Sequence, residues 1–114
     1  MRIYSWNIIR FDSQKCTDIT PPIKGGTINE TRKKAIQYLK SHKFYGDIHH
    51  GYMAEIHMRH NTSQASLYGC VYYCDGGAWY VSPQSKKNDG DWFICYPVRT
   101  DGSIDVSRPN YESI

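Results

Sequence analysis

The sequence predicts an α+β fold in which one helix packs against a largely antiparallel sheet of four to five strands, in the order β-α-β-β-β-β. Three observations lead to this class: one capped amphipathic segment that begins at Thr27, several segments of alternating polar and apolar residues, and turn signals between them. At 114 residues the chain has the usual length of one domain. We therefore expect residues 1–114 to form a single compact domain.

Residues 2–11 alternate with the period of a β-strand, and both sets of positions are apolar. One face carries Ile3, Ile9 and Phe11, and the other carries Tyr4, Trp6 and Ile8. A strand with two apolar faces belongs in the middle of a sheet. Residues 13–26 follow as SQKCTDITPPIKGG, and their Pro-Pro and Gly-Gly pairs predict a loop inside the domain.

The predicted helix begins at Thr27, because Thr27 and Glu30 have the spacing of a capping box. Its apolar stripe consists of Ile28, Ala35, Ile36 and Leu39. A basic surface consists of Lys33, Lys34 and Lys40, with Arg32 beside the apolar stripe. Gly46 is expected to end this segment in a left-handed conformation.

The second half of the chain predicts strands only. Residues 52–60 alternate and form a half-exposed strand, and residues 68–83 form a hairpin. Residues 92–98 form a further strand, and RTDGSI at 99–104 signals a turn that can begin a short terminal hairpin.

The turn of the hairpin determines which side chains share a face. A three-residue turn at Asp75-Gly76-Gly77 places Tyr72 opposite Tyr80 and Tyr73 opposite Trp79. The faces then read Leu67, Gly69, Val71, Tyr73, Trp79 and Val81 on one side and Tyr68, Cys70, Tyr72, Cys74, Tyr80 and Ser82 on the other. Because one helix covers one face of a sheet, the tyrosine face is predicted to be exposed and to bind a partner. The candidate binding residues are Tyr68, Tyr72, Tyr80 and Phe93; the alternative is that these rings only stabilise the hairpin through cross-strand pairs.

The charge balance permits nucleic-acid binding without requiring it. The net charge is +3 with 14 basic and 11 acidic residues, which is less basic than a dedicated duplex binder. Lys33 and Lys40 on the helix could contact phosphates, and exposed rings could stack single-stranded bases. A single-stranded DNA or RNA binding module is therefore an alternative function.

One line of residues resembles the machinery of an enzyme. Glu55, His57 and Arg59 project from the same face of the predicted strand, where His57 could act as a general base, Glu55 could orient it and Arg59 could bind a phosphate. These residues are weak candidates for a metal-independent nuclease, because acid, base and cation also occur together on solvated strand faces.

No metal site or cofactor is expected. His57 and His60 point to opposite faces of a strand, and Cys70 and Cys74 are about 13 Å apart on a strand at the usual rise. No nucleotide-binding glycine loop or nucleophile motif is present.

The N-terminal residues lack the apolar run of a signal peptide, and no apolar segment is long enough for a membrane span. We therefore expect a cytoplasmic protein with reduced cysteines and no contact with a membrane. The sequence favours a small non-enzymatic protein that docks on another macromolecule, most readily a protein, as an inhibitor or adaptor of the phage or mobile-element type. A homodimer formed through an exposed face or strand edge is a further expectation to test.

Overall fold

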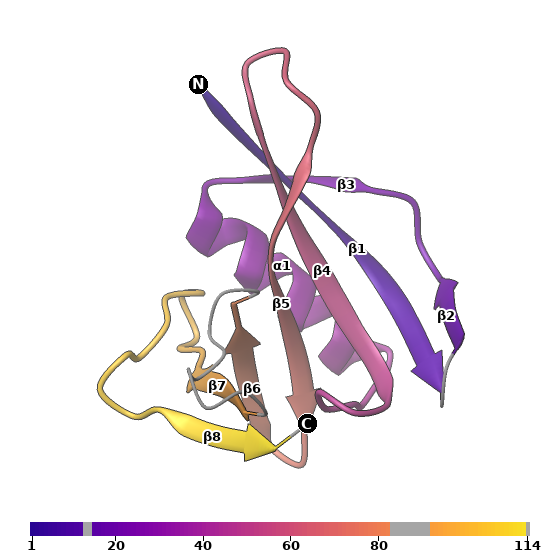
Figure 1. Cartoon of the computed structure of the whole chain (residues 1–114), viewed down its shortest axis with the longest axis vertical. Coiled ribbons are helices and arrows are strands. Elements are labelled where there is room, and N and C mark those ends of the chain that lie inside the picture. Colours follow the sequence, from indigo (N-terminus) through magenta and orange to yellow (C-terminus); the bar gives the residue numbers. More distant parts are fainter. Residues whose placement is uncertain (13–14, 83–91, 114) are drawn as a thin grey trace.

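The structure is built on one antiparallel sheet whose longest pair of neighbouring strands is β1 (Arg2–Asp12) and β4 (Gly51–His60) (Figure 1). The computed structural model describes residues 1–12, 15–82 and 92–113. Over these residues the sheet has eight strands in the order β2-β1-β4-β5-β6-β7-β8, and β3 pairs with β1 beside β2. The other elements are β2 (Lys15–Asp18), β3 (Ile23–Gly26), helix α1 (Ile28–Ser41), β5 (Ser66–Cys74), β6 (Gly77–Val81), β7 (Trp92–Pro97) and β8 (Asn110–Ser113).

One helix and a largely antiparallel sheet are confirmed, whereas the predicted four to five strands and their order are wrong. The main difference lies in residues 13–26, where the sequence predicts a loop. Within that segment β2 and β3 each pair with β1, and Pro21 and Pro22 lie between them. All four residues of β2 are exposed, so this strand has no apolar alternation by which the sequence could reveal it.

Helix α1 covers one face of the sheet and lies behind it in Figure 1. Its Ala35 and Leu39 are fully buried against side chains from four strands. The strand residues of this cluster are Trp6, Ile8, Ala54, Ile56, Val71 and Tyr80. Each fully buried aliphatic side chain contributes about 1.5–3 kcal/mol, so this contact holds the helix on the sheet.

The start of α1 confirms the predicted cap, and its end differs from the prediction. The backbone N–H of Glu30 donates to the Thr27 hydroxyl at 3.2 Å. The helix ends at Ser41, and the left-handed residue that follows is Lys43 with a φ of 56°. The predicted stop at Gly46 is wrong, because Gly46 forms an isolated bridge with Gly51.

Arg32 is buried, although the sequence places it beside the apolar stripe at the helix surface. The residue is 6% exposed, and its Nε donates to the carbonyl oxygen of Gly102 at 2.7 Å. Nη2 donates to the Asn29 side chain at 2.6 Å, and the guanidinium lies 5.2 Å from the centre of the Tyr80 ring. Burial lowers the pKa of Arg32, opposed by the nearby tyrosines. The loop that follows β7 therefore encloses a cation that the helical wheel leaves near the surface.

The β5–β6 hairpin turns through two residues, and the predicted three-residue turn is wrong. Cys74 pairs with Gly77, and both turn residues have positive φ, 30° at Asp75 and 82° at Gly76. This is the backbone that the right-handed twist of two strands favours. Relative to the prediction β6 slips by one residue, which moves every side chain of that strand to the other face.

The sheet face opposite α1, called the outer face below, has an apolar half and a polar half. The apolar half contains the buried side chains Ile9, Met53, Tyr72, Val81 and Cys95, with Phe11, Ile48, Cys70, Cys74, Trp79 and Phe93 packed around them. The polar half contains Ser5, Asn7, Glu55 and His57 on β1 and β4. No helix in the described part of the chain has the length and hydropathy needed to cross a membrane.

Gly102 allows the loop after β7 to contact the helix. Its φ is 89°, and a Cβ atom at this position would collide with the backbone oxygen of Asn29. Gly76 has a similar φ of 82° but has no atom within 4 Å of the Cβ position.

Substitutions of Gly76 and Gly102 can be compared directly, because both residues have a positive φ but only at Gly102 would a Cβ atom collide with the helix. We expect Gly76→Ala to lower the free energy of unfolding by about 1–2 kcal/mol, the usual cost of the left-handed conformation. Gly102→Ala should cost roughly 3 kcal/mol or more, because the loop must also move away from Asn29 and from Arg32. Urea denaturation followed by circular dichroism measures both variants, and equal losses would contradict the packing of this loop.

Candidate functional site

The tyrosines predicted to share an exposed face lie on different faces of the sheet, and two of them are buried. Tyr72 is 3% exposed on the outer face, whereas Tyr80 is 5% exposed on the helix side. The Tyr80 hydroxyl donates to the carbonyl oxygen of Tyr68 at 3.2 Å. Tyr68 itself is half-buried, with its ring edge-on to Tyr4 at 5.6 Å, and Phe93 is half-buried on the outer face. The predicted exposed tyrosine face is therefore wrong, because the shorter hairpin turn separates its members.

Burial also suppresses the reactivity of the outer-face thiols. Burial, with a smaller contribution from Glu55, raises the pKa of Cys70 to about 12. Burial likewise raises the pKa values of Cys74 and Cys95, and burial and a hydrogen bond with Cys95 raise that of Tyr72. At pH 7 the Cys70 side chain is therefore almost entirely the neutral thiol, whereas the thiolate is the form that attacks or binds metals.

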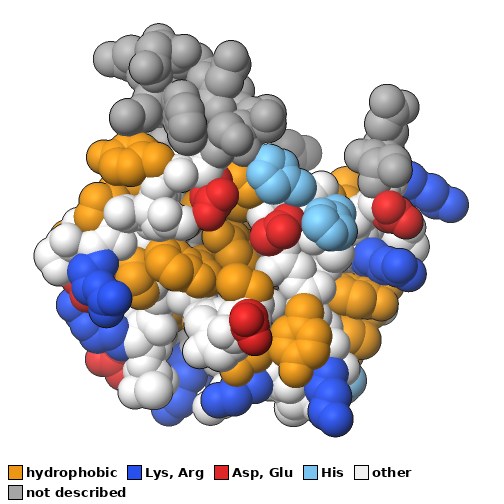
Figure 2. Space-filling model, turned by 90° about the horizontal axis from the view of Figure 1, so that it is seen from below, with side chains coloured by type: hydrophobic (Ala, Val, Ile, Leu, Met, Phe, Trp, Pro, Cys, Tyr) orange, Lys and Arg blue, Asp and Glu red, His pale blue; other side chains and the backbone are white. Residues whose placement is uncertain are grey.

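In the loop before β4, the side chain of Asp47 forms a turn with the backbone of His49 and His50. Asp47 accepts the backbone N–H groups of His49 at 2.7 Å and His50 at 3.0 Å, and His50 Nδ1 lies 3.6 Å from the same oxygen. Burial opposes ionisation of Asp47, but these hydrogen bonds outweigh it and lower the pKa. Figure 2 shows histidine and acidic side chains next to each other on this end of the molecule. Among the described residues, no group of three or more histidine, cysteine or acidic side chains could hold a metal ion.

Glu55, His57 and Arg59 lie on the outer face of β4, as predicted, next to β1. His57 Nε2 lies 3.7 Å from Glu55 Oε1, and Asn7 Nδ2 donates to the same oxygen at 3.3 Å. Asn7 is buried, so it fixes the carboxylate, while Glu55 and His57 are partly exposed. The strand register thus brings a supported carboxylate and an imidazole together, and Arg59 follows at the exposed end of the strand.

His57 and Arg59 also line a groove at the N-terminal end of β1. The groove has a volume of about 1340 Å³ and takes its walls from β1, β3, β4 and the start of α1. Its charged side chains and its histidine are Arg2, Lys24, Glu30, Arg59 and His57, and Met1 lies beside them. The rest of the lining is Ile3, Tyr4, Ser5, Pro22, Gly26, Thr27, Ile28 and Ala65. Basic groups therefore outnumber the single carboxylate, Glu30, and we call this surface the cationic groove.

One edge of β1 is open along the cationic groove. The backbone N–H of Ile8 donates to Thr20 Oγ1, and its carbonyl oxygen accepts from Ile19, so even-numbered residues of β1 direct their backbone groups away from β4. The last pair between β1 and β3 is Tyr4 with Gly26, after which Thr27 caps the helix. The N–H and C=O groups of Arg2 therefore face an edge along which none of the described strands pairs.

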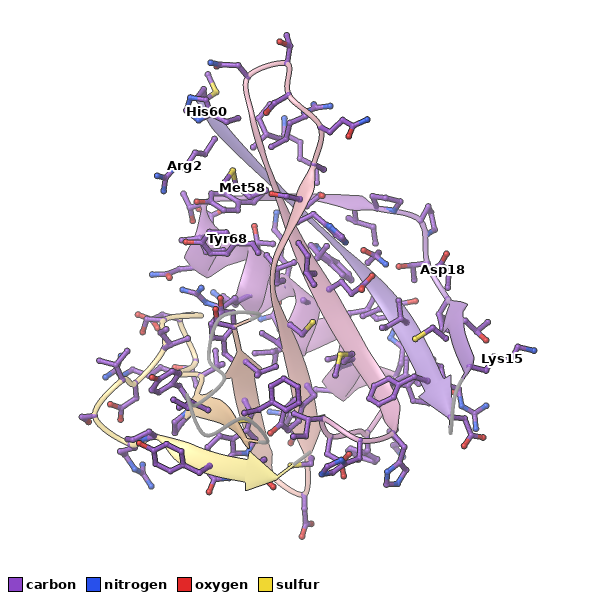
Figure 3. All side chains as sticks on the ribbon, viewed as in Figure 1. Arg2, Lys15, Asp18, Met58, His60 and Tyr68 are labelled. Carbon is purple, nitrogen blue, oxygen red and sulfur yellow. The ribbon has the colours of Figure 1, made fainter. Side chains whose placement is uncertain are left out.

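The sequence did not reveal that Arg2 and Lys24 belong to this site. Figure 3 shows Arg2, Met58 and Tyr68 on one side of the protruding end of the sheet, with Lys15 far from them at the other end of β1. Lys24 reaches the groove only because β3 pairs with β1, in a segment that reads as a loop. The open edge results from the turn into the helix at Gly26, whose φ is 99°.

The predicted binding residues Lys33 and Lys40 lie elsewhere. Both are exposed on α1, and both line a smaller pocket formed with the β5–β6 hairpin and the segment after β7. Of the predicted site residues, the structure thus brings Glu55, His57 and Arg59 together at one place and Lys33 and Lys40 at another.

Comparison with known proteins gives no match: no family model, no curated protein and no solved structure is similar to this chain.

The burial of Tyr72 and Tyr80 has a consequence that can be measured. We expect Tyr72→Ser and Tyr80→Ser each to lower the free energy of unfolding by about 3–5 kcal/mol, as when a buried aromatic ring is removed. Tyr45→Ser is the control, because Tyr45 is 52% exposed, and it should cost less than about 1 kcal/mol. Thermal and urea unfolding test this, and unchanged stability of both core variants would mean that the rings are surface groups.

Proposed function

We propose that this chain is a non-enzymatic binding protein that docks on an acidic, extended segment of another protein through the cationic groove. The observation that carries the proposal is the coincidence of an excess of basic groups with a strand edge at Arg2 along which no described strand pairs. A volume near 1340 Å³ exceeds the roughly 300–1,000 Å³ of sites for small molecules, and suits a chain segment better. A cytoplasmic inhibitor or adaptor is the role that we propose for such a protein.

Charge alone does not provide enough affinity for this role. Exposed ion pairs contribute only about 0.2–1 kcal/mol each, so Arg2, Lys24 and Arg59 together contribute a few kcal/mol at most. Their main effects are faster association and selection of acidic partners. The remaining affinity must come from backbone pairing at Arg2 and from the apolar lining Ile3, Pro22 and Ile28.

The lining favours a peptide over a single-stranded nucleic acid. Proteins that bind single strands stack bases on exposed aromatic rings. The aromatic rings among the lining residues are Tyr4, which is 7% exposed and offers no open face to a base, and His57, whose imidazole is partly exposed and lies next to Glu55. An extended peptide needs no ring and can use the N–H and C=O groups of Arg2, as in strand addition.

Charge reversal in the groove tests the proposal. We expect a fluorescent peptide of alternating glutamate and threonine to bind the wild-type chain at low salt, and Arg2→Glu combined with Arg59→Glu to weaken binding about tenfold or more. The matched control is Lys15→Glu combined with Lys34→Glu, which changes the net charge equally at exposed positions outside the groove. Fluorescence anisotropy gives the affinities.

Three further arms of this experiment separate the alternatives. Binding of oligothymidine but not of the peptide would identify a nucleic-acid partner, and equal losses in both double variants would show a nonspecific charge effect. Light scattering across a dilution series shows whether the chain self-associates, as it must if a second copy occupies the open edge. Hydrogen exchange should show increased protection of the Arg2 amide in the bound state.

A metal-independent nuclease is a second candidate, favoured by the contact of His57 with Glu55 and by the support from Asn7. The nuclease hypothesis predicts that the wild-type chain cleaves total RNA in the presence of EDTA and that the His57→Ala variant does not. The binding proposal expects no cleavage by either protein. Equal cleavage by both would indicate a contaminating nuclease.

A further inference from the structure

A second pocket lies between α1 and the β5–β6 hairpin, outside the cationic groove. Its volume is about 260 Å³. The helix contributes Lys33, Ile36, Gln37 and Lys40, the hairpin contributes Tyr73, Gly76 and Ala78, and the segment after β7 contributes Val98, Arg99 and Thr100. Three elements that are distant in sequence therefore form its walls.

The charges of this pocket have one sign. Lys33, Lys40 and Arg99 line it, and no aspartate or glutamate does. Neither lysine forms an ion pair with a carboxylate of the described residues, and the Lys40 ammonium lies 5.9 Å from the centre of the Tyr73 ring. Lys33 and Lys40 are seven residues apart on one side of the helix, about 10 Å along its axis, so both side chains can reach a ligand placed between them.

The wall that carries Arg99 is fixed by hydrogen bonds. Arg99 Nη1 donates to the Ser103 hydroxyl at 3.2 Å and to the carbonyl oxygen of Ile104 at 3.0 Å. Arg99 Nη2 lies 3.4 Å from Asp105, which neutralises part of its charge. The same loop is held against the helix by Arg32 and Gly102. Arg99 therefore shapes the wall, and the two lysines supply most of the attraction for an anion.

Apolar groups form the remainder of the pocket. Ile36, Ala78 and Val98 line it beside the Tyr73 ring, which stacks on Tyr45 with the ring centres 5.8 Å apart. A small site with paired ammonium groups over an aromatic and aliphatic surface suits a ligand that has an anionic end and an apolar or planar part. Lysine ammonium groups are common ligands of phosphate.

We infer that the pocket formed by Lys33, Lys40, Tyr73 and Arg99 binds the phosphate group of a small phosphorylated organic molecule. The two ammonium groups bind the phosphate, and the organic part lies on Tyr73, Ile36 and Val98. The volume of about 260 Å³ is slightly below the roughly 300–1,000 Å³ of sites for drug-sized ligands, so it limits the enclosed part of the ligand to about the size of a sugar phosphate. This site is separate from the cationic groove and does not depend on the function proposed for that groove.

Nuclear magnetic resonance titrations with three probes test the inference: inorganic phosphate, adenosine monophosphate and adenosine. We expect both phosphate-containing probes to shift the amide signals of Lys33, Lys40, Tyr73 and Arg99, with adenosine monophosphate binding more tightly than inorganic phosphate. Lys33→Gln combined with Lys40→Gln should weaken binding at least about tenfold. Lys34→Gln combined with Lys15→Gln removes the same charge outside the pocket and should change the affinity less than about twofold.

Each outcome decides for or against the site. Similar affinities for phosphate and for adenosine monophosphate would contradict the inference that the organic part of the ligand lies on Tyr73, Ile36 and Val98. Adenosine binding as tightly as its monophosphate would overturn it, as would the absence of shifts at millimolar probe. Equal losses in the two double variants would also overturn it, because a general charge effect would then explain the binding. The amide spectrum of each variant checks its folding. We expect every variant to fold, because all four lysines are exposed.

Discussion

The antiparallel pairing of β1 with β4 is the interaction on which the rest of the structure depends. Its register runs without interruption from Arg2 opposite His60 to Phe11 opposite Gly51. Because side chains alternate along both strands, this single register assigns the apolar residues Trp6, Ile8, Ala54 and Ile56 to the helix side. The same register assigns Asn7, Glu55 and His57 to the outer face. A slip by one residue would expose the core and bury the carboxylate.

The apolar side chains on the two faces of the sheet are buried by different partners. On the helix side, Ala35 and Leu39 of α1 complete the core. On the outer face, side chains of the sheet pack on one another around Tyr72 and Cys95. The hydroxyl of Tyr72 forms a hydrogen bond with the thiol of Cys95. The aromatic richness of the hairpin therefore serves burial on both sides.

Both proposed binding surfaces lie where the chain leaves a regular element. At Gly26 the chain turns from β3 into the cap of α1, which ends the pairing along β1 before Arg2. At Gly102 the chain approaches α1 closely enough to cover Arg32, and this places Arg99 opposite the exposed lysines of the helix. A glycine at each point permits a positive φ, and the site next to it is a consequence of the path that follows.

The sequence by itself determined those features that depend on neighbouring residues. The two apolar faces of β1, the Thr27 cap, the helix and the shared face of Glu55, His57 and Arg59 all follow from local periodicity and spacing, and all are present. The tertiary structure alone decided the rest. β2 and β3 exist because β1 offers them an edge, and the path of the loop after β7 decided that Arg32 is buried. The choice between a two-residue and a three-residue turn decided the faces of Tyr72 and Tyr80. The physical reason is that strand pairing and loop docking join residues that are distant in the chain, so no local pattern records them.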